Sequence, residues 1–258
     1  MKTAKKLLVI LVKKLDYASA IAVRLTQLTG KSKVPIHPKH FLSRRPWFTE
    51  YLSKKDIVLD LGSGNGQNAI KAAKIAKKIV GLEYDQTLIN IAVKTAVARR
   101  IKNVKFVKTD LEKKIKYKNN SFDKIIFLDV LEHLANRDQI LDEIKRVLKP
   151  SGLLFLGVPN KETSWKKIQR IVGVCYYSDP DHKIEYSKKG IINLLKSHKF
   201  EIHYFGYGKF DTPLRGIFDI IGSISIPIYK KVTKWREKKA KNNPIEASGF
   251  EIVAANRE

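Results

Sequence analysis

Hydrophobic and polar positions follow two alternating periods along most of the chain after Lys55. Short runs rich in β-branched residues are followed by stretches with the period of an amphipathic helix. The runs predicted as strands are 57–61, 78–84, 103–110, 122–130, 152–160, 200–208 and 249–257, and the predicted helices are 67–78, 86–99 and 137–148. Because such alternation places helices on both faces of a parallel sheet, the pattern predicts an α/β fold.

Two segments lie outside this alternation. Apolar residues spaced by three and four through residues 4–28 predict an amphipathic N-terminal helix, with the stripe Ala4, Leu8, Leu11, Leu15, Ala18, Ala22 and Leu25. A linker with two prolines follows, so residues 1–40 are predicted to precede a domain of residues 41–258. Residues 208–248 are too long for a hairpin loop, and an insertion of that length usually has a function.

The composition is that of a folded protein. The chain has 258 residues, of which 43% are hydrophobic, enough for a full core. The single cysteine, Cys175, excludes an intramolecular disulfide and a multi-cysteine zinc site, and we expect it to be buried. The apolar block 7–12 is short for a signal peptide, and no stretch is apolar enough to span a bilayer. We therefore expect a cytoplasmic protein.

The charge is strongly positive. A formal net charge of +26 favours a polyanionic partner, either nucleic acid or an anionic membrane surface. Lysine predominates among the 51 basic residues. Specific recognition of bases and phosphates relies more on arginine, so a lysine-rich excess can equally be a solvated surface. The charge alone therefore leaves the partner open.

A glycine-rich turn follows the first predicted strand. In "DLGSGNG", Gly62, Gly64 and Gly66 stand where a strand leads into a helix. Glycine lets a ligand approach the free N–H groups of a helix start. The third glycine comes one position earlier than in the dinucleotide pattern G-x-G-x-x-G, and the turn lacks the Lys-Ser/Thr of a P-loop. The turn predicts a ligand site of another kind, or simply a tight strand–helix joint.

Acidic residues are scarce in this basic chain, yet they follow strand after strand. They are Asp60, Glu83, Asp85, Asp110, Asp129 and Glu132. The carboxyl ends of the strands are where open α/β sheets bind ligands. Carboxylates gathered there favour a ligand that is cationic and rich in hydroxyl groups. Glu83 stands about twenty residues after the glycine turn, where an acid binds a ribose diol.

Five segments in series resemble the class I S-adenosylmethionine-dependent methyltransferases, close to the quinone-biosynthesis group. They are "VLDLGSGNG", "IVGLEYDQTLI", "VKTDLE", "FDKIIFLDVLEHL" and "LKPSGLLFLGVPN", the last with Ser151 where glycine is more usual. The resemblance covers about residues 41–207 and the last strand. It implies a Rossmann-like fold with a seven-stranded, mostly parallel sheet whose last strand is antiparallel.

The same resemblance implies S-adenosyl-L-methionine as the cofactor. It places Glu83 at the ribose, and Asp110 with the backbone of Leu111 at the adenine. The full set of implied cofactor-binding residues is Asp60, Gly62, Gly64, Gly66, Glu83, Tyr84, Asp110, Leu111 and Asp129.

A general base is needed only if the methyl acceptor must lose a proton. His182 is the first candidate, because histidine titrates near neutrality. The alternative for His182 is a surface histidine that pairs with Asp179 or Asp181. His133 is the second candidate, with a structural or substrate-lining role as its alternative.

Two aromatic residues are candidates for the lining of the site. Tyr176 and Tyr177 could line the acceptor pocket or be ordinary core aromatics. No metal site is predicted.

The insertion suggests the kind of acceptor. Residues 214–241 combine an apolar stretch with a cationic tail that contains Trp235, which is typical of a segment at a membrane surface. The alternative is a lid packed on the protein's own pocket. We therefore expect methyl transfer to oxygen or carbon of a small, hydrophobic or lipid-like acceptor, with peripheral contact at the inner face of an anionic membrane.

Two other functions stay open. An RNA methyltransferase is favoured by the charge, although "LDVLEH" stands where enzymes that methylate base amino groups carry N/D-P-P-Y/F. A non-catalytic S-adenosylmethionine-binding protein is the third possibility. The oligomeric state is not predicted.

Overall fold

The computed structural model describes residues 9–10, 17–18, 20–32, 37–42, 46–179 and 181–257. The chain divides into two compact units. The first, which we call the helical unit, comprises Met1–Arg44, Asn160–Pro180 and Tyr207–Gly249. The second, which we call the sheet unit, comprises Arg45–Pro159, Asp181–Gly206 and Phe250–Glu258. The predicted division at residue 40 stays a prediction.

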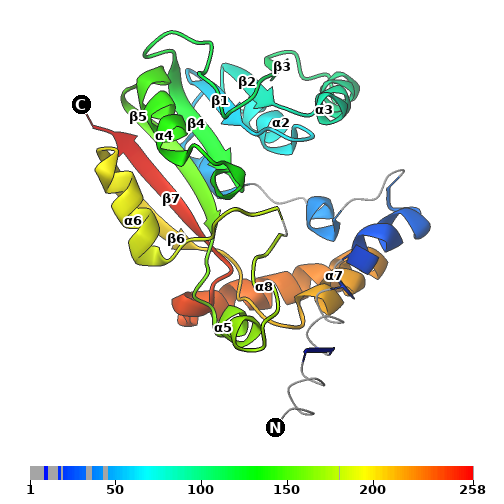
Figure 1. Ribbon diagram of the computed structural model, residues 1–258. Helices are drawn as coiled ribbons and strands as arrows, with labels where there is room; N and C mark the ends of the chain where they lie inside the picture. The colour runs from blue at the N-terminus through cyan, green and yellow to red at the C-terminus, as the bar shows by residue number, and fades with distance from the viewer. Residues whose placement is uncertain are drawn as a thin grey trace. The chain divides into compact units, whose positions relative to one another are not determined.

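A seven-stranded sheet forms the sheet unit (Figure 1). Its strands are β1 (Ile57–Leu61), β2 (Lys78–Glu83), β3 (Val104–Lys108), β4 (Phe122–Leu128), β5 (Leu148–Pro159), β6 (Phe200–Tyr207) and β7 (Gly249–Asn256), in the order β3-β2-β1-β4-β5-β7-β6. The pairs β1–β2, β2–β3, β1–β4 and β4–β5 are parallel. Strand β7 points opposite to β4 (Figure 1). The predicted α/β class and mostly parallel sheet are confirmed.

Helices connect these strands. The sheet unit contains α2 (Gln67–Ala73), α3 (Gln86–Ala98), α4 (Arg137–Val147) and α6 (Lys188–Ser197), with the 3-10 helices η2 (Trp47–Tyr51) and η3 (Leu131–His133). The predicted helix 67–78 is too long, because the N–H groups of Lys77 and Lys78 donate to the carbonyl of Asp56 and turn the chain into β2. Asp85 caps the start of α3, because its carboxylate accepts from the N–H groups of Thr87 and Leu88.

The core of the sheet unit lies between the sheet and its helices. It includes the fully buried side chains of Phe48, Val58, Ile126, Phe155 and Val253. The rings of Phe48 and Phe155 stack with their centroids 5.9 Å apart. Close packing of this kind fixes the strands, and therefore the loops at their carboxyl ends.

The helical unit is built from short segments far apart in the sequence. It contains a helix at residues 20–28, η1 (Pro38–Phe41), α5 (Ser164–Ile171), α7 (Arg215–Ile224), α8 (Ile226–Asn242) and η4 (Pro244–Glu246). Ala18 and Ala22 of the predicted N-terminal stripe are buried, while Ala4, Leu8, Leu11 and Leu15 lie outside the described residues. The insertion 208–248 therefore contains two α-helices and the 3-10 helix η4.

A polar network packs these helices together. The carboxylate of Asp219 lies 3.2 Å from Nε2 of His37 and accepts from the hydroxyl of Tyr229 at 2.8 Å. The hydroxyl of Ser223 donates to the carbonyl of Ala22. Helices α7 and α8 therefore pack within their own unit.

Two features of the chain bear on earlier expectations. Cys175 is exposed, so the expectation of a buried cysteine is wrong; it lies just beyond α5, where the chain has left the packed helix. Within the described part of the chain, no helix has the length and hydropathy needed to cross a bilayer.

Candidate active site

A pocket of about 490 Å³ opens at the carboxyl ends of β1, β2, β3 and β4. Its lining residues are Gly62, Glu83, Tyr84, Thr109, Asp110, Leu111, Glu112, Asp129, Val130, His133 and Leu134. Four of the segments that carry the predicted cofactor residues therefore meet at one pocket. Thr109, Glu112, Val130 and Leu134 were not named from the sequence, although each lies within two residues of a residue that was.

The glycine turn requires glycine for two different reasons. Gly62, Gly64 and Gly66 have φ values of +65°, +52° and +79°, a backbone region that residues other than glycine rarely adopt. A Cβ at Gly62 would lie 2.5 Å from Cγ2 of Val130. A Cβ at Gly64 would meet nothing within 4 Å. Gly62 therefore permits packing, whereas Gly64 leaves open space beside the backbone.

Glu83 is held rigidly at the edge of the pocket. Its carboxylate accepts from the backbone N–H of Gly64 at 2.7 Å, of Tyr84 at 2.8 Å and of Asp85 at 3.0 Å. The bond from Gly64 joins the end of β2 to the glycine turn after β1. A carboxylate has about four acceptor positions, so Glu83 retains capacity for a hydroxyl donor of a ligand. Tyr84 is largely exposed.

Asp60 is buried at the end of β1 without full hydrogen bonding. Its side chain belongs to a residue only 2% exposed, and Oδ2 has no hydrogen-bond partner among the described residues. The Oγ of Ser63 is also buried and has no hydrogen-bond partner among the described residues. Burial raises the pKa of Asp60 to about 8, the N–H of Ala69 opposes this, and the charge of Glu83 adds to it. Unsatisfied acceptors beside the glycine turn fit a cationic ligand.

Asp110 follows β3 and Asp129 follows β4, and both line the pocket although β2 and β1 lie between these two strands. One oxygen of Asp110 accepts from the N–H of Glu112 at 3.0 Å, and the other lies 3.4 Å from Nζ of Lys113. Asp129 is exposed at φ +57°, a conformation that a non-glycine residue adopts only at a cost. Such strain is concentrated at functional sites.

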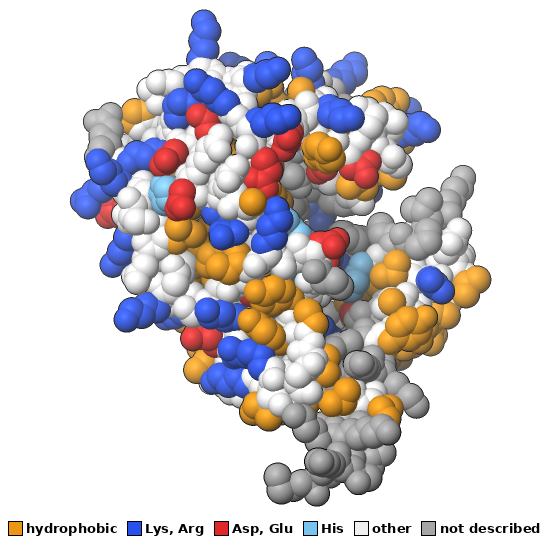
Figure 2. All heavy atoms as spheres, viewed as in Figure 1, with side chains coloured by type: hydrophobic (Ala, Val, Ile, Leu, Met, Phe, Trp, Pro, Cys, Tyr) orange, Lys and Arg blue, Asp and Glu red, His pale blue; other side chains and the backbone are white. Residues whose placement is uncertain are grey.

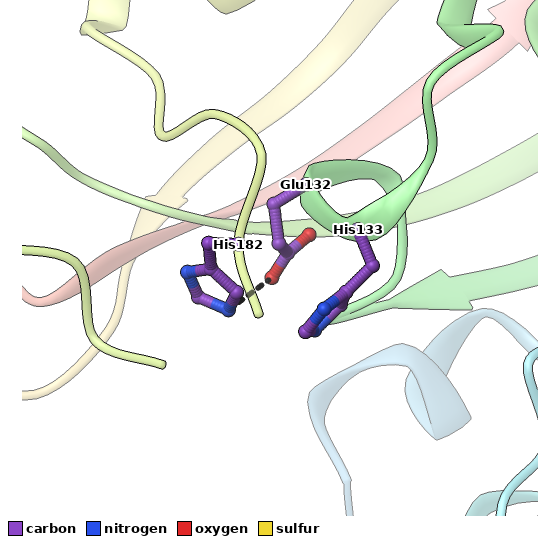
Figure 3. A group of neighbouring side chains, drawn as sticks. All are labelled: Glu132, His133 and His182. Carbon is purple, nitrogen blue, oxygen red and sulfur yellow. Dashed lines mark ion pairs between the residues drawn. The ribbon is translucent and has the colours of Figure 1, made fainter. Parts of the chain in front are cut away.

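Glu132, His133 and His182 form a cluster that we call the histidine cluster (Figure 3). It adjoins the pocket, because His133 is one of the residues that line it. Nδ1 of His182 lies 3.0 Å from a carboxylate oxygen of Glu185, and its Nε2 lies 3.8 Å from a carboxylate oxygen of Glu132. The rings of His133 and His182 meet edge to face, with centroids 4.6 Å apart. The side chain of His182 is 6% exposed, so the alternative of a surface histidine is wrong.

Backbone hydrogen bonds bring His182 to this place. The N–H groups of Lys183 and Ile184 donate to the carbonyl of Glu132 at 2.8 and 3.3 Å. Glu112 adds a second tie, because its carboxylate accepts from the N–H groups of Ala135 and Asn136 and from the ammonium of Lys183. The bond from Ala135 is the largest cause that holds the pKa of Glu112 below its usual range.

Tyr176 and Tyr177 belong to the helical unit. Their rings pack edge to face with centroids 4.8 Å apart, and the guanidinium of Arg170 lies over Tyr176. Their contact with an acceptor stays a prediction.

A family model described as a methyltransferase domain matches residues 52–206, more than half of the chain. The chain belongs to this methyltransferase family. The resemblance to the class I enzymes is thereby confirmed, and S-adenosyl-L-methionine is the cofactor that the family uses. The partly exposed carboxylate of Glu83 fits the hydroxyl groups of this cofactor, and the unsatisfied carboxyl of Asp60 fits its positive charge.

Curated relatives match at low identity. The mitochondrial ubiquinone biosynthesis O-methyltransferase of Dictyostelium discoideum is 28% identical over 159 residues, which cover 55% of this chain and 49% of that protein. A probable S-adenosylmethionine-dependent methyltransferase of Mycolicibacterium smegmatis is 28% identical over 145 residues, covering 56% and 52%. The chain thus spans about half the length of these relatives.

Solved structures agree on the fold. A SAM-dependent methyltransferase from Methanosarcina mazei superposes with a TM-score of 0.58 at 20% identity, covering 84% of this chain and 99% of that one. A SAM-dependent methyltransferase from Aquifex aeolicus gives a TM-score of 0.53 at 18% identity, with 95% of both chains covered. The Rossmann-like class I fold is confirmed.

Proposed function

We propose that this protein transfers a methyl group from S-adenosyl-L-methionine to oxygen or carbon of a small, hydrophobic acceptor. The observation that carries the proposal is the histidine cluster at the pocket. Its imidazole nitrogens and carboxylate are groups that handle protons, and His133 itself lines the pocket. An acceptor that must lose a proton on methylation needs such groups close by.

The opposite end of the pocket suits the cofactor. S-adenosylmethionine supplies a methyl group that is activated by its positively charged sulfur. Glu83 would accept hydrogen bonds from its ribose hydroxyl groups, and Asp110 with the N–H of Leu111 would bind the adenine. Gly64 gives the ligand room beside the backbone, and the buried carboxyl of Asp60 favours a positive charge once it is ionised.

The acceptor would then lie between the cofactor and the histidine cluster. Positioning the accepting atom in line with the bond to the methyl group is the main contribution that the chain can make, and it can be worth several orders of magnitude in rate. His133 and His182 would take part in removal of the acceptor's proton. Tyr176 and Tyr177 stay candidates for the wall of the acceptor site.

Two observations support a hydrophobic acceptor met at a membrane surface. Relatives carry names that refer to ubiquinone biosynthesis. The helical unit exposes many large apolar side chains, namely Leu28, Ile168, Ile171, Leu214, Ile217, Ile224, Ile228, Trp235 and Ile245. Helix α8 adds lysines, and where Figure 1 draws α5 and α8, Figure 2 shows hydrophobic side chains with basic ones among them. We propose that residues 214–241 dock peripherally on an anionic membrane at its inner face.

The methyl acceptor can be found with radiolabelled S-adenosylmethionine. The protein is incubated with a cell extract, and the products are separated into organic-soluble, aqueous small-molecule, nucleic-acid and protein fractions. We expect label in the organic-soluble fraction, and no label with a Glu83→Ala variant. Label that appears only in RNA would refute the proposed acceptor class and favour the RNA methyltransferase alternative. Cofactor binding without any labelled product would favour the non-catalytic alternative.

Membrane docking needs a separate test. The variant Ile224→Ser/Ile228→Ser removes two side chains that are 63% and 52% exposed, so its fold should be unaffected. We expect it to lose most of its binding to vesicles that contain phosphatidylserine. Val97→Ser is the matched control, because Val97 is 72% exposed on α3 of the sheet unit. Undiminished vesicle binding by the double variant would refute docking through this segment.

A further inference from the structure

The three side chains of the histidine cluster offer more than proton transfer. Glu132 and His133 come from η3, and His182 comes from the loop before α6. One ligand atom from each lies within 4.8 Å of the others (Figure 3). Two imidazole nitrogens and one carboxylate oxygen form a donor set that first-row divalent ions accept with further positions left open. We propose that Glu132, His133 and His182 bind a divalent transition ion such as Zn²⁺ or Mn²⁺.

One ligand-atom separation is close to that of a metal site, and the other two are at most 4.8 Å. An ion with bonds of about 2.1 Å holds tetrahedral ligand atoms about 3.4 Å apart. Nε2 of His182 lies 3.8 Å from the nearer oxygen of Glu132, so this pair must close by only a few tenths of an ångström. His133 is partly exposed, and rotation of its side chain can bring its nitrogen nearer.

A second carboxylate orients the buried histidine. Glu185 lies 3.0 Å from Nδ1 of His182, so the proton of a neutral imidazole belongs on Nδ1. The lone pair of Nε2 then points toward Glu132. Metal-binding histidines usually have this arrangement, in which a carboxylate fixes the ring from behind. His182 is therefore preset to offer Nε2 as a ligand.

The charges of the cluster also favour a cation. Glu132 and Glu185 are each about 1% exposed, and both approach the same histidine. Burying two carboxylates is costly unless positive charge balances them. A divalent ion bound between Glu132 and His182 would supply such charge. The identity of the donors favours a transition ion over Mg²⁺, which prefers oxygen ligands.

The consequence for the reaction rests on the proposed function. An ion in the cluster would reach the pocket beside His133, where an open position can take a hydroxyl of the acceptor. A bound divalent ion lowers the pKa of such a hydroxyl. Histidines that bind the ion would not themselves accept the proton. The acceptor O–H bond would break with its proton leaving to water, and the freed electron pair would form the O–CH₃ bond. The bond from the methyl carbon to sulfur breaks, and its electrons leave the sulfur neutral. The inference therefore selects oxygen as the methylated atom.

The test measures ion binding by the full chain without cofactor or acceptor. Metal-stripped protein is titrated with Co²⁺, followed by visible absorption, and with Zn²⁺ and Mn²⁺, followed by calorimetry. We expect about one ion per chain, with little competition from Mg²⁺. His133→Ala and His182→Ala should each weaken binding by at least about ten-fold, and Glu185→Gln by about 10- to 100-fold. His203→Ala, at an exposed position of β6, should leave the affinity unchanged.

Several outcomes separate this inference from the proposed function. Lack of stoichiometric binding, or equal affinity in His133→Ala and the parent protein, overturns the inference. His133 is partly exposed, so this variant decides the question even if His182→Ala fails to fold. Full methyl transfer by the metal-stripped protein in a chelator overturns the metal inference and leaves the proposed function intact. Ion binding by a protein that does not bind S-adenosylmethionine supports the inference and refutes the function.

Discussion

Replacing Asp60 by Asn should abolish a proton release that accompanies cofactor binding. Burial raises the pKa of Asp60 to about 8, so at pH 7 the carboxyl is protonated in about nine molecules of ten. A cationic ligand beside it favours the ionised form and lowers this pKa. If the pKa of the complex falls below about 6, binding at pH 7 expels close to one proton from each chain.

The size of the effect depends on pH in a defined way. Ionising Asp60 at pH 7 costs about 1.4 kcal/mol, because its pKa lies about one unit above that pH. At pH 9 the carboxyl is already ionised in the free protein, and the release disappears. The amino group of the cofactor also titrates near pH 8, so Asp60→Asn supplies the baseline at each pH.

Calorimetry in two buffers with different ionisation enthalpies measures the number of protons released. We expect the parent protein to release up to about one proton more than Asp60→Asn at pH 7, and we expect Asp60→Asn to bind the cofactor at least about ten-fold more weakly. Equal proton release by the two proteins would show that Asp60 does not sense the ligand's charge. It would remove Asp60 from the cofactor site.

Asp60→Asn should weaken cofactor binding but stabilise the folded protein. The pKa of Asp60 is higher in the folded than in the unfolded chain, so its contribution to stability is fully present below its unfolded pKa and is lost as the pH rises through about 8. Asp60→Asn should therefore raise the free energy of unfolding at pH 7, by up to about 4 kcal/mol. Urea unfolding at pH 5 and pH 8 measures the difference, and a gain that is larger at pH 5 would contradict the reasoning.

Four further substitutions test the pocket and the network that supports it. Gly62→Ala should cost about 2 kcal/mol or more of unfolding free energy, since its Cβ would meet Val130, whereas Gly64→Ala should cost only about 1 kcal/mol of backbone strain; equal losses in urea unfolding would refute this contrast. Glu83→Gln should weaken cofactor binding at least about ten-fold, and unchanged affinity by calorimetry would exclude it from the ribose site. Arg146→Ala should cost about 2–4 kcal/mol, because the guanidinium binds a largely buried carboxylate and two backbone carbonyls; a loss below 0.5 kcal/mol would show that this network is not needed.

The pattern of the sequence predicted the sheet well because most of its strands are short, largely apolar and bounded by a turn. Its failures have local causes. The helix after the glycine turn ends at Ala73, five residues early, because Asp56 binds the backbone of the following residues. Helices α7 and α8 were not predicted as helices, because the break at Ser225–Pro227 interrupts their common period. Residues 214–241 were interpreted as an apolar stretch with a cationic tail.

The two halves of the site differ in how far the sequence could reveal them. Glu83 and Asp110 follow strands, and the carboxyl ends of parallel strands always share one edge of the sheet. The histidine cluster has no such rule behind it. Glu132 and His182 are distant in the sequence and meet because Lys183 and Ile184 bond to the backbone of Glu132. The sequence did not indicate Glu185 as a site residue, because a buried carboxylate beside a histidine leaves no periodic pattern.

The order of the strands has a consequence for synthesis of the protein on the ribosome. Strand β7 is the last strand of the sequence, yet it lies between β5 and β6. Until residues 249–256 have left the ribosome, the edges of β5 and β6 that later pair with β7 stay unpaired. Each of these open edges can pair with a strand of another nascent chain. The sheet thus closes late, through contacts between residues far apart in the chain, and such closure is slow and open to aggregation. We expect chaperones to bind nascent chains that stop before β7.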